Sequence, residues 1–334
     1  MTPPTAPVIR EPGHVPLVHV VRDGLVEGVH HGSVVVLGAD GEVRYEAGDP
    51  AAAFYPRSAL KPLQAVAMLR AGLELDGPLL ALAAASHSGE QVHQDGAETI
   101  LRTAGLGPEA LLNPADLPYG AQQREDWLTA GRGPSRLAHN CSGKHAAMLA
   151  LCRSRGWSET DYLDPGHPLQ CTIADTVTEL TGAPPARTTV DGCGAPLFAV
   201  SLYGLTRAAA AIATAAPGTP EARLADAVRA HPEMVAGTGR DVTALMRAVP
   251  GLIAKDGFEA VQIAALPDGR AVGVKIADGS DRARMPVTAA ALAVAGVDPA
   301  LLAPFAGTPV YGGGKPMGAL RAAGPLAARA ALPA

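Results

Sequence analysis

The sequence predicts an α/β protein with one antiparallel sheet built from N- and C-terminal strands, flanked by helices, and a helical lobe from the middle of the chain. Two observations lead to this prediction. Short apolar runs separated by an Asp-Gly pair, a tight-hairpin signal, occur at 33–48 and again at 259–278. Between these two hairpins, apolar residues recur at spacings of three and four, which is the helical period. Strands at both ends with helices between them fit a single sheet covered by helices.

After a Pro-rich and irregular start, SVVVLGADGEVRYEAG (33–48) is expected to form two strands that turn at Asp40-Gly41. The helical period then covers seven segments: 59–72, 95–105, 143–156, 168–182, 197–215, 219–231 and 240–248. EAVQIAALPDGRAVGVKIAD (259–278) is the second predicted hairpin, with its turn at Asp268-Gly269. We expect a last helix over 286–296 and a frayed helix in the tail PLAARAALPA.

No linker or internal repeat divides the chain, so we expect one unit, 1–334, made of two lobes. The sheet-containing lobe would comprise about 15–60 and 250–325, and the mainly helical lobe about 61–249. With 48% hydrophobic and 18% charged residues, a chain of 334 residues can bury a large core. Sites in such folds tend to lie in the cleft between lobes.

Composition also excludes some partners. The formal net charge is −5 and no block of basic residues occurs, which argues against nucleic acid as a partner. The N-terminus lacks the basic start and apolar run of an export signal, and the longest Ala-rich run, near 208–218, is too short to cross a bilayer. We therefore expect a soluble cytoplasmic protein without a membrane partner. Its four cysteines would be reduced: Cys141, Cys152, Cys171 and Cys193.

Lysine is scarce in this chain, since only five of its 27 basic residues are lysine. Arginine cannot lose its proton in a protein, whereas a desolvated lysine can act as a base. A lysine that remains is therefore a candidate for chemistry that arginine cannot perform. The alternative is that a few lysines persist without a role, and the neighbours of Lys61, Lys144 and Lys255 argue against it.

The stretch RSALKP, starting at Arg57, places Ser58 and Lys61 three residues apart, on one face of a helix. A buried, neutral lysine can take the proton of a serine and make it a nucleophile. Pro62 places Ser58 at the helix start, and its missing N–H predicts an irregular first turn. The alternative is a serine that caps the helix, with an exposed lysine one turn on.

Two further motifs contain polar residues next to apolar segments. LLALAAA runs into Ser86 and His87, where small polar residues indicate the mouth of a cleft, although an ordinary helix start is the alternative. Lys255 ends an apolar segment and is followed by Asp-Gly. Serine β-lactamases carry S-x-x-K, a serine and a Lys-containing strand in this order. Three weak signals in one order are stronger than any one alone.

Cysteines mark a possible metal site. Within HNCSGKH, Cys141 and His145 are four residues apart, which can bring both toward one ion, and Cys193 lies in DGCGAP. This spacing matches no common structural zinc motif, so the residues alone favour packed free cysteines over a metal site.

Seven motifs together resemble the L-asparaginase II family, the thermolabile or Rhizobium-type asparaginases, over about 15–320. They are RSALKP, AASHSGE, HNCSGKH, DGCGAP, HPEMVAGTGR (231–240), KDGFEAV and VGVKIADG. The resemblance implies a fold akin to serine β-lactamases and glutaminases. It also implies hydrolysis of the side-chain amide of L-asparagine to aspartate and ammonia, and we expect this reaction to pass through an acyl-enzyme on a serine that is activated by lysine. The chain differs more from the family at 113–137 and in its tail.

The resemblance assigns roles residue by residue, with no organic cofactor and a homodimer as the expected assembly. It implies two Ser–Lys pairs, a zinc site in which Lys144 replaces His145 as third ligand, and contacts with the substrate. These positions are Ser58 with Lys61, Ser86 with Lys255, the ligands Cys141, Lys144 and Cys193, and the substrate contacts Arg57, Asp191 and His87. Alternatives are a glutaminase or another β-lactamase-like serine amidohydrolase, or a non-catalytic zinc or amino-acid binding protein.

Overall fold

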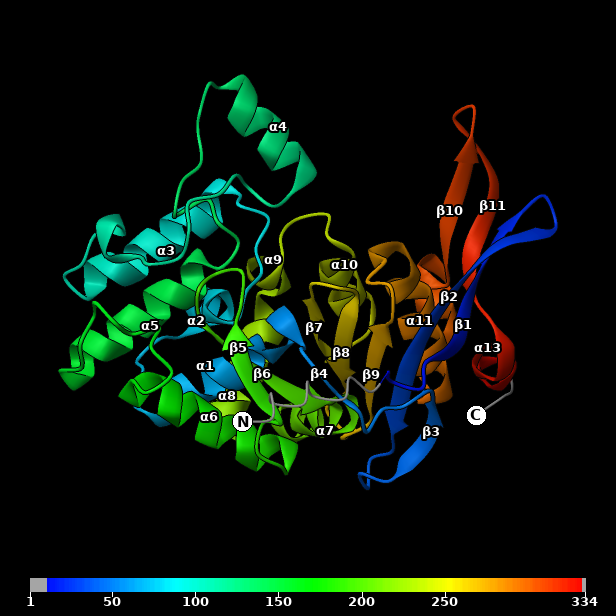
Figure 1. Cartoon of the computed structure of the whole chain (residues 1–334), viewed down its shortest axis with the longest axis horizontal. Helices are drawn as coiled ribbons and strands as arrows, with labels where there is room; N and C mark the ends of the chain where they lie inside the picture. The colour runs from blue at the N-terminus through cyan, green and yellow to red at the C-terminus, as the bar shows by residue number, and fades with distance from the viewer. Residues whose placement is uncertain (1–10, 332–334) are drawn as a thin grey trace, which may run out of the picture.

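A computed structural model describes residues 11–331 of the chain. Its main element is an antiparallel sheet with the strand order β10-β11-β1-β2-β9-β8-β7, and β3 pairs with β2 off this path (Figure 1). The strands are β1 (Val15–Arg22), β2 (Leu25–Leu37), β3 (Val43–Ala47), β7 (Ile253–Gly257), β8 (Val261–Ala265), β9 (Ala271–Ile276), β10 (Gly307–Gly312) and β11 (Lys315–Ala322). N- and C-terminal segments thus share one sheet, which confirms the predicted fold class.

Helices cover the sheet and fill the middle of the chain, where a small second sheet has the order β4-β6-β5. The α-helices are α1 (Lys61–Arg70), α2 (Gly77–Ala83), α3 (Gln91–Thr103), α4 (Ala121–Thr129), α5 (Ser142–Arg155), α6 (Pro168–Thr181), α7 (Leu202–Ala213), α8 (Pro220–Ala230), α9 (Pro232–Val235), α10 (Asp241–Ala248), α11 (Asp281–Val294), α12 (Pro299–Leu302) and α13 (Gly324–Ala330). The small sheet consists of β4 (Ala53–Phe54), β5 (Arg187–Val190) and β6 (Pro196–Ser201). Among residues 11–331, no helix is long and apolar enough to span a membrane.

The two predicted hairpins are present. β2 and β3 flank Asp40-Gly41, and β8 and β9 flank Asp268-Gly269. Gly41 has φ 79° and Gly269 has φ 97°, in the left-handed region that glycine tolerates without a Cβ penalty. The turn chemistry of the sequence therefore located both hairpins correctly.

One predicted helix is partly wrong. Residues 197–201 of the expected helix 197–215 belong to strand β6, and helix α7 begins only at Leu202. A short apolar run that is buried on both sides has no periodicity to separate strand from helix. The Ser201 side chain accepts a hydrogen bond from the Gly204 amide at 3.0 Å and so starts the helix after the strand.

The expected helix 286–296 is present as α11, but it begins earlier, at Asp281, and it contains Pro286. Proline lacks the N–H that would bond to the carbonyl of Arg282. Thr308 in β10 donates to that carbonyl at 2.9 Å, so a neighbouring strand supplies the missing partner. The tail helix is present as α13, and its last predicted residues, 332–334, lie outside the described residues.

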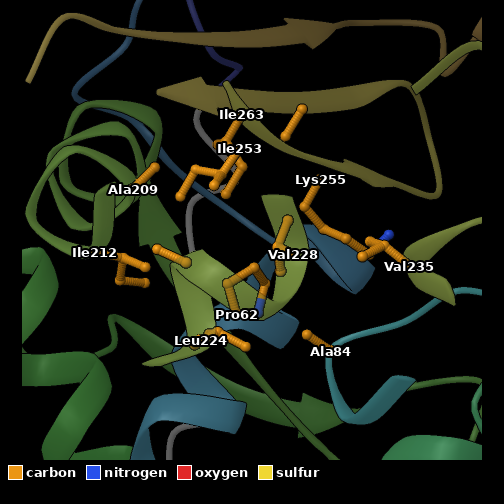
Figure 2. A pocket seen from close by; sticks show the side chains of 12 residues that line it. Pro62, Ala84, Ala209, Ile212, Leu224, Val228, Val235, Ile253, Lys255 and Ile263 are labelled. Carbon is orange, nitrogen blue, oxygen red and sulfur yellow. The ribbon is translucent and has the colours of Figure 1, made fainter. Parts of the chain in front are cut away.

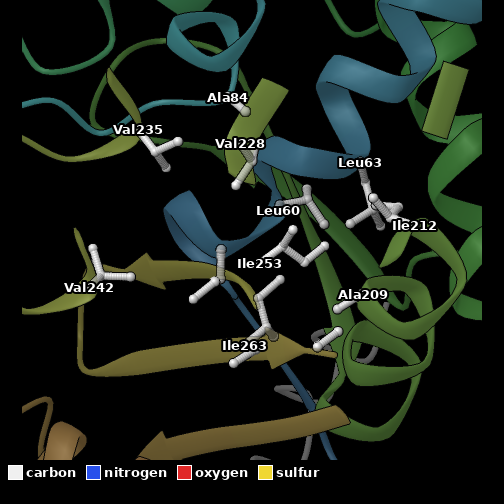
Figure 3. Packing of buried hydrophobic residues seen from close by; sticks show 14 of the residues in the cluster. Leu60, Leu63, Ala84, Ala209, Ile212, Val228, Val235, Val242, Ile253 and Ile263 are labelled. Carbon is white, nitrogen blue, oxygen red and sulfur yellow. The ribbon is translucent and has the colours of Figure 1, made fainter. Parts of the chain in front are cut away.

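The core beneath β7 and β8 joins the sheet to the helices. Ile253 and Ile263, which lie on these two neighbouring strands, pack among Leu60, Leu63 and Ala209 from η1 (Arg57–Leu60), α1 and α7 (Figure 3). All five are buried. Burial of each leucine or isoleucine side chain stabilises the folded state by roughly 1.5–3 kcal/mol. This cluster therefore holds the helices against the edge of the sheet.

Gly257, the last residue of β7, allows the strand to lie against η1. A Cβ at this position would lie 2.4 Å from the Pro56 carbonyl oxygen and 3.0 Å from the Ala59 nitrogen. Both are backbone atoms, so neither can rotate away. The close approach of β7 to the chain around Ser58 therefore requires glycine.

We expect Gly257→Ala to lower the free energy of unfolding by about 1–3 kcal/mol, since the added methyl must push η1 away from β7. Urea denaturation measures this change. Gly28→Ala in β2 is the matched control, because its Cβ would meet nothing closer than Val20 at 3.4 Å. Equal stability of the two variants would contradict the close packing of β7 on η1.

Candidate active site

Several segments that are far apart in sequence surround a pocket of about 220 Å³. It lies where η1, the 139–141 loop, the 191–193 loop and the end of β7 meet. The lining residues are Arg57, Ser58, Asp116, Tyr119, His139, Asn140, Cys141, Asp191, Gly192, Cys193 and Phe258. Five residues predicted from sequence for the site thus line one pocket.

Ser58 lies in η1, a 3₁₀ turn that leads into α1. The Ser58 carbonyl accepts from the Lys61 amide, because Pro62 has no N–H to offer. The irregular first turn expected from Pro62 is therefore present. Ser58 is half-buried, and its hydroxyl makes no hydrogen bond within residues 11–331.

Lys61 is almost fully buried, with 1% of its surface exposed. Its amino group contacts three acceptors: the Ala85 carbonyl, Ser86 Oγ at 2.9 Å and Cys141 Sγ at 3.1 Å. The serine that contacts the Lys61 amine is therefore Ser86, whereas the sequence suggested Ser58. Lys61 joins the first Ser–Lys motif to the second serine and to the cysteine motif.

The turn that carries Ser86 is clamped by backbone hydrogen bonds. The Ser86 and Ser88 amides donate to the carbonyls of Val235 and Ala236, at 2.9 and 2.7 Å. Gly237 has φ 134°, and a Cβ there would lie 2.3 Å from Ser88 Oγ. Helix α3 starts only at Gln91, without a side-chain cap, so Ser86 does not serve as a helix cap.

His87 does not reach the pocket, which corrects its expected role in substrate binding. Its ring is fully buried, and Nδ1 accepts from the Gly89 amide at 3.1 Å. The proton therefore lies on Nε2, which donates to Ser142 Oγ at 2.9 Å. Burial, and next the proximity of His93, lower its pKa well below the ordinary value. A neutral imidazole with both nitrogens occupied holds the 86–89 turn against α5.

Lys255 lies on β7, at the edge of the sheet, with 1% of its surface exposed. Its amino group donates to the Asp256 carbonyl at 2.7 Å and to Asp256 Oδ1 at 2.6 Å, and not to Ser86 as the sequence suggested. Figure 2 shows Lys255 beside an apolar cavity of about 20 Å³, whose other lining residues are all apolar. Burial, opposed by the Asp256 charge and assisted by the Lys61 charge, lowers the pKa of Lys255 to about 8.

Arg57 and Asp191 form an ion pair at the pocket wall. Arg57 Nε donates to Asp191 Oδ1 at 2.7 Å, and the guanidinium lies 5.1 Å from the centre of the Phe258 ring. Arg57 has φ 52°, a left-handed backbone that is strained for any residue with a Cβ. The strained backbone and the stacking together fix one cation and one anion side by side in the pocket.

The three expected metal ligands lie in one buried group. Lys144 Nζ is 3.2 Å from Cys193 Sγ, and Cys141 packs against Cys193. Because the two thiols share a hydrogen bond, the pKa of Cys193 lies below and that of Cys141 above the ordinary thiol value. His145 Nε2 is buried nearby without a partner among the described residues. Within residues 11–331, no group of three or more His, Cys, Asp or Glu residues is placed to hold a metal ion.

Sequence reasoning missed several pocket residues. Tyr119 and Asp116 come from the 113–137 segment, which docks on the Ser86 turn through the Gly120 amide and the Ser88 carbonyl, 2.9 Å apart. His139 accepts from the Cys141 amide, and burial, then the Lys61 charge, lower its pKa to about 4. His139 lies within the quoted motif HNCSGKH, but neither its spacing nor its neighbours indicated that it faces a pocket.

A serine hydroxyl at the pocket and two buried lysines on neighbouring elements are groups that nucleophilic and proton-transfer chemistry can use. The sequence profile of the L-asparaginase II family matches residues 18–322. The chain therefore belongs to the L-asparaginase II family.

Solved structures with similar folds include Mglu in its native form, at 16% identity and a TM-score of 0.41. The match covers 74% of this chain and 60% of that one, so the chain spans about 60% of the length of Mglu. A β-lactamase from Mycobacterium bovis matches at 16% identity and a TM-score of 0.41, over 74% of this chain and 87% of that one. EstCE1, a hydrolase with promiscuous acyltransferase activity, matches at 15% identity and a TM-score of 0.35, over 80% and 90%. No curated protein sequence matches the chain.

We expect His87→Ala to lower the free energy of unfolding by about 2–4 kcal/mol, because it leaves a cavity and two buried partners without hydrogen bonds. KM for the substrate should change less than about twofold, since the ring does not face the pocket. Urea denaturation and steady-state kinetics measure the two effects. Val92→Ala, on the half-exposed surface of α3, is the control and should cost less than about 0.5 kcal/mol. A raised KM with unchanged stability would contradict this prediction and indicate that His87 does contact the substrate.

Proposed function

We propose that this protein is an L-asparagine amidohydrolase that releases L-aspartate and ammonia through an acyl-enzyme on serine. The observation that carries the proposal is the buried amine of Lys61, which lies one turn after the pocket serine Ser58 and bonds Ser86 at 2.9 Å. A lysine that is desolvated among a hydroxyl, a thiol and a carbonyl can accept a serine proton. Membership of the family supports the amide as the bond that is cleaved.

Ser58 is the nucleophile of this proposal because it lines the pocket, whereas Ser86 is 4% exposed and lies behind it. Ser58 Oγ attacks the side-chain carbonyl carbon of asparagine, and its proton passes to the amine of Lys61. The C–N bond then breaks, and the nitrogen leaves as ammonia after taking up a proton. Ser86 connects Lys61 to this transfer. Water hydrolyses the resulting β-aspartyl ester and restores the serine.

The pocket also fits the zwitterionic end of a small amino acid. Arg57 offers a guanidinium to the α-carboxylate, and Asp191 offers a carboxylate to the α-ammonium group. A volume of about 220 Å³ suits a ligand of this size. Tyr119 and Phe258 border the same space and would limit the length of the side chain. We infer that these four residues orient asparagine with its amide toward Ser58.

The thiols of Cys141 and Cys193 suit a zinc ion, because thiolates are ligands that zinc prefers, and Lys144 Nζ lies 3.2 Å from Cys193 Sγ as a third donor once it has lost its proton. We propose that these residues hold it. When bound there, zinc would supply a Lewis acid for orienting substrate groups at the pocket wall. The serine and lysines perform the proton transfers described above.

We expect Ser58→Ala and Ser86→Ala each to reduce ammonia release from L-asparagine at least about 1000-fold, since residues that act as a unit lose nearly all activity singly. Ser158→Ala, on an exposed loop, is the control and should retain activity. Ammonia is measured by a coupled assay. If Ser58→Ala keeps most of its rate, RSALKP only starts a helix and the nucleophile lies elsewhere.

L-Glutamine and a chromogenic cephalosporin, assayed in parallel, test the nearest alternatives. One methylene is worth only about 1–3 kcal/mol of discrimination in a pocket, so a glutaminase is the closest competing function. If kcat/KM is higher for glutamine than for asparagine, the protein is a glutaminase. Turnover of the cephalosporin alone would indicate a β-lactam hydrolase. Binding of asparagine without turnover of any of the three would indicate a binding protein.

Removal of zinc by a chelator is expected to raise KM for asparagine while leaving kcat within about twofold, if the metal only orients the substrate. Elemental analysis should find about one zinc per chain in the wild type and less in Cys193→Ser. Cys171→Ser, an exposed cysteine, is the matched control. A loss of kcat with unchanged KM would contradict an orienting role.

A further inference from the structure

The motif HPEMVAGTGR (231–240) is prominent in the sequence, and the amide chemistry above gives it no role. In the structure this segment contacts both halves of the site. Its carbonyls at Val235 and Ala236 hold the Ser86 turn. Thr238 reinforces that clamp, since its hydroxyl donates to Glu90 at 3.0 Å. Arg240, the last residue of the motif, reaches β7 instead, where Nη2 lies 2.8 Å from Asp256 Oδ2.

Asp256 therefore divides its carboxylate between two cations. Oδ1 accepts from Lys255 at 2.6 Å and Oδ2 from Arg240 at 2.8 Å. Asp256 is nearly buried, and the side chain of Arg240 is only 18% exposed. Arg240 is held in turn by Tyr119, whose ring centre lies 4.9 Å from the guanidinium carbon. The arginine thus links the pocket residue Tyr119 to the lysine on β7.

We propose that Arg240 is a positioning residue for Lys255. It binds one oxygen of Asp256 and so weakens the attraction of that carboxylate for the Lys255 ammonium group, which allows the amine to lose its proton. Arg240 does not line the pocket itself, although it stacks on the pocket residue Tyr119, and it acts on Lys255 through Asp256. The inference rests on the proposed function, in which a neutral lysine moves protons.

Charged groups face this lysine and its carboxylate from several elements. Asp256 lies beside it on β7, Lys61 approaches from α1, and Arg240 precedes α10. Arg284 on α11 adds a further positive charge near Asp256 and is itself held by Asp241 at 2.7 Å and Asp281 at 2.7 Å. Tyr119 from the 113–137 segment and the neutral Gln262 on β8 complete the surroundings.

The balance of these charges has a defined sign. Burial alone would raise the pKa of the Asp256 carboxyl, but Lys255, Arg240 and Arg284 outweigh it and hold that pKa well below its ordinary value. The carboxylate is therefore ionised at any working pH. Asp256 raises the pKa of Lys255 and Arg240 lowers it. Removing the arginine charge must raise the titration midpoint of Lys255, and removing the carboxylate must lower it.

The scarcity of lysine makes a direct measurement practical, because the chain holds only five. Protein labelled with ¹³C at lysine Cε gives one resonance per lysine, and Lys255→Arg identifies the signal of Lys255. We expect Arg240→Gln to raise its midpoint by about one pH unit and Asp256→Asn to lower it by about one. Arg240→Lys keeps the positive charge and should restore a midpoint near that of the wild type.

Arg247→Gln on α10 is the matched control, since its guanidinium pairs with Glu233 at 3.0 Å on the surface and should leave the midpoint unchanged. The acidic limb of kcat/KM for ammonia release should move with the same midpoints in each variant. Shifts in the same direction for Arg240→Gln and Asp256→Asn, or no shift in either, would overturn the proposal.

Should Arg240→Gln fail to fold, Arg240→Met replaces it with the same readout. Failure of both would overturn the proposal and assign the pair to fold stability alone. The lysine titration does not depend on turnover, so an enzyme inactive toward asparagine with opposite shifts would refute only the proposed function. Active enzyme with unmoved midpoints would refute only the role of Arg240.

Discussion

The buried amine of Lys61 is the contact on which the rest of the site depends. A lysine removed from water must satisfy its donors within the protein, because an unpaired buried polar group costs several kcal/mol. Its three acceptors come from the Ala85–Ser86 turn and from Cys141, and the backbone of the same residue closes the turn that holds Ser58. One residue, through its side chain and its backbone amide, therefore sets the relative positions of both serines and of the cysteine group.

The second lysine is held by a different device, a carboxylate shared between cations. Asp256 is buried, which is tolerable only because Lys255 and Arg240 pair with its two oxygens and Arg284 lies nearby. Such an arrangement is weak evidence for stability, since burying paired charges costs about as much as their attraction returns. We infer that it fixes the protonation states of Lys255 and Asp256, since an apolar cavity borders one side of Lys255.

The pocket itself is assembled under backbone constraints that oppose ordinary preferences. Arg57 is held at φ 52°, and Glu259 at φ 65° lies in the tight turn that presents Phe258 to the arginine. Strained residues persist where their surroundings fix them, and here both flank a place where Gly257 lets β7 approach η1. The ion pair of Arg57 with Asp191 can therefore hold a fixed orientation for a small zwitterion.

The sequence alone determined the local elements and the chemical inventory. Asp-Gly turns and the helical period located two hairpins and most helices, and scarce lysines with short serine motifs made Ser58, Lys61, Ser86 and Lys255 the candidates for catalysis. It could not determine their pairing: the spacing of Ser58 and Lys61 suggested a bond that instead goes to Ser86, 25 residues away. Periodicity and turn chemistry act between near neighbours, whereas the partners of a buried charge are whatever the packed helices and sheet bring within about 3 Å. Only the tertiary structure decided those.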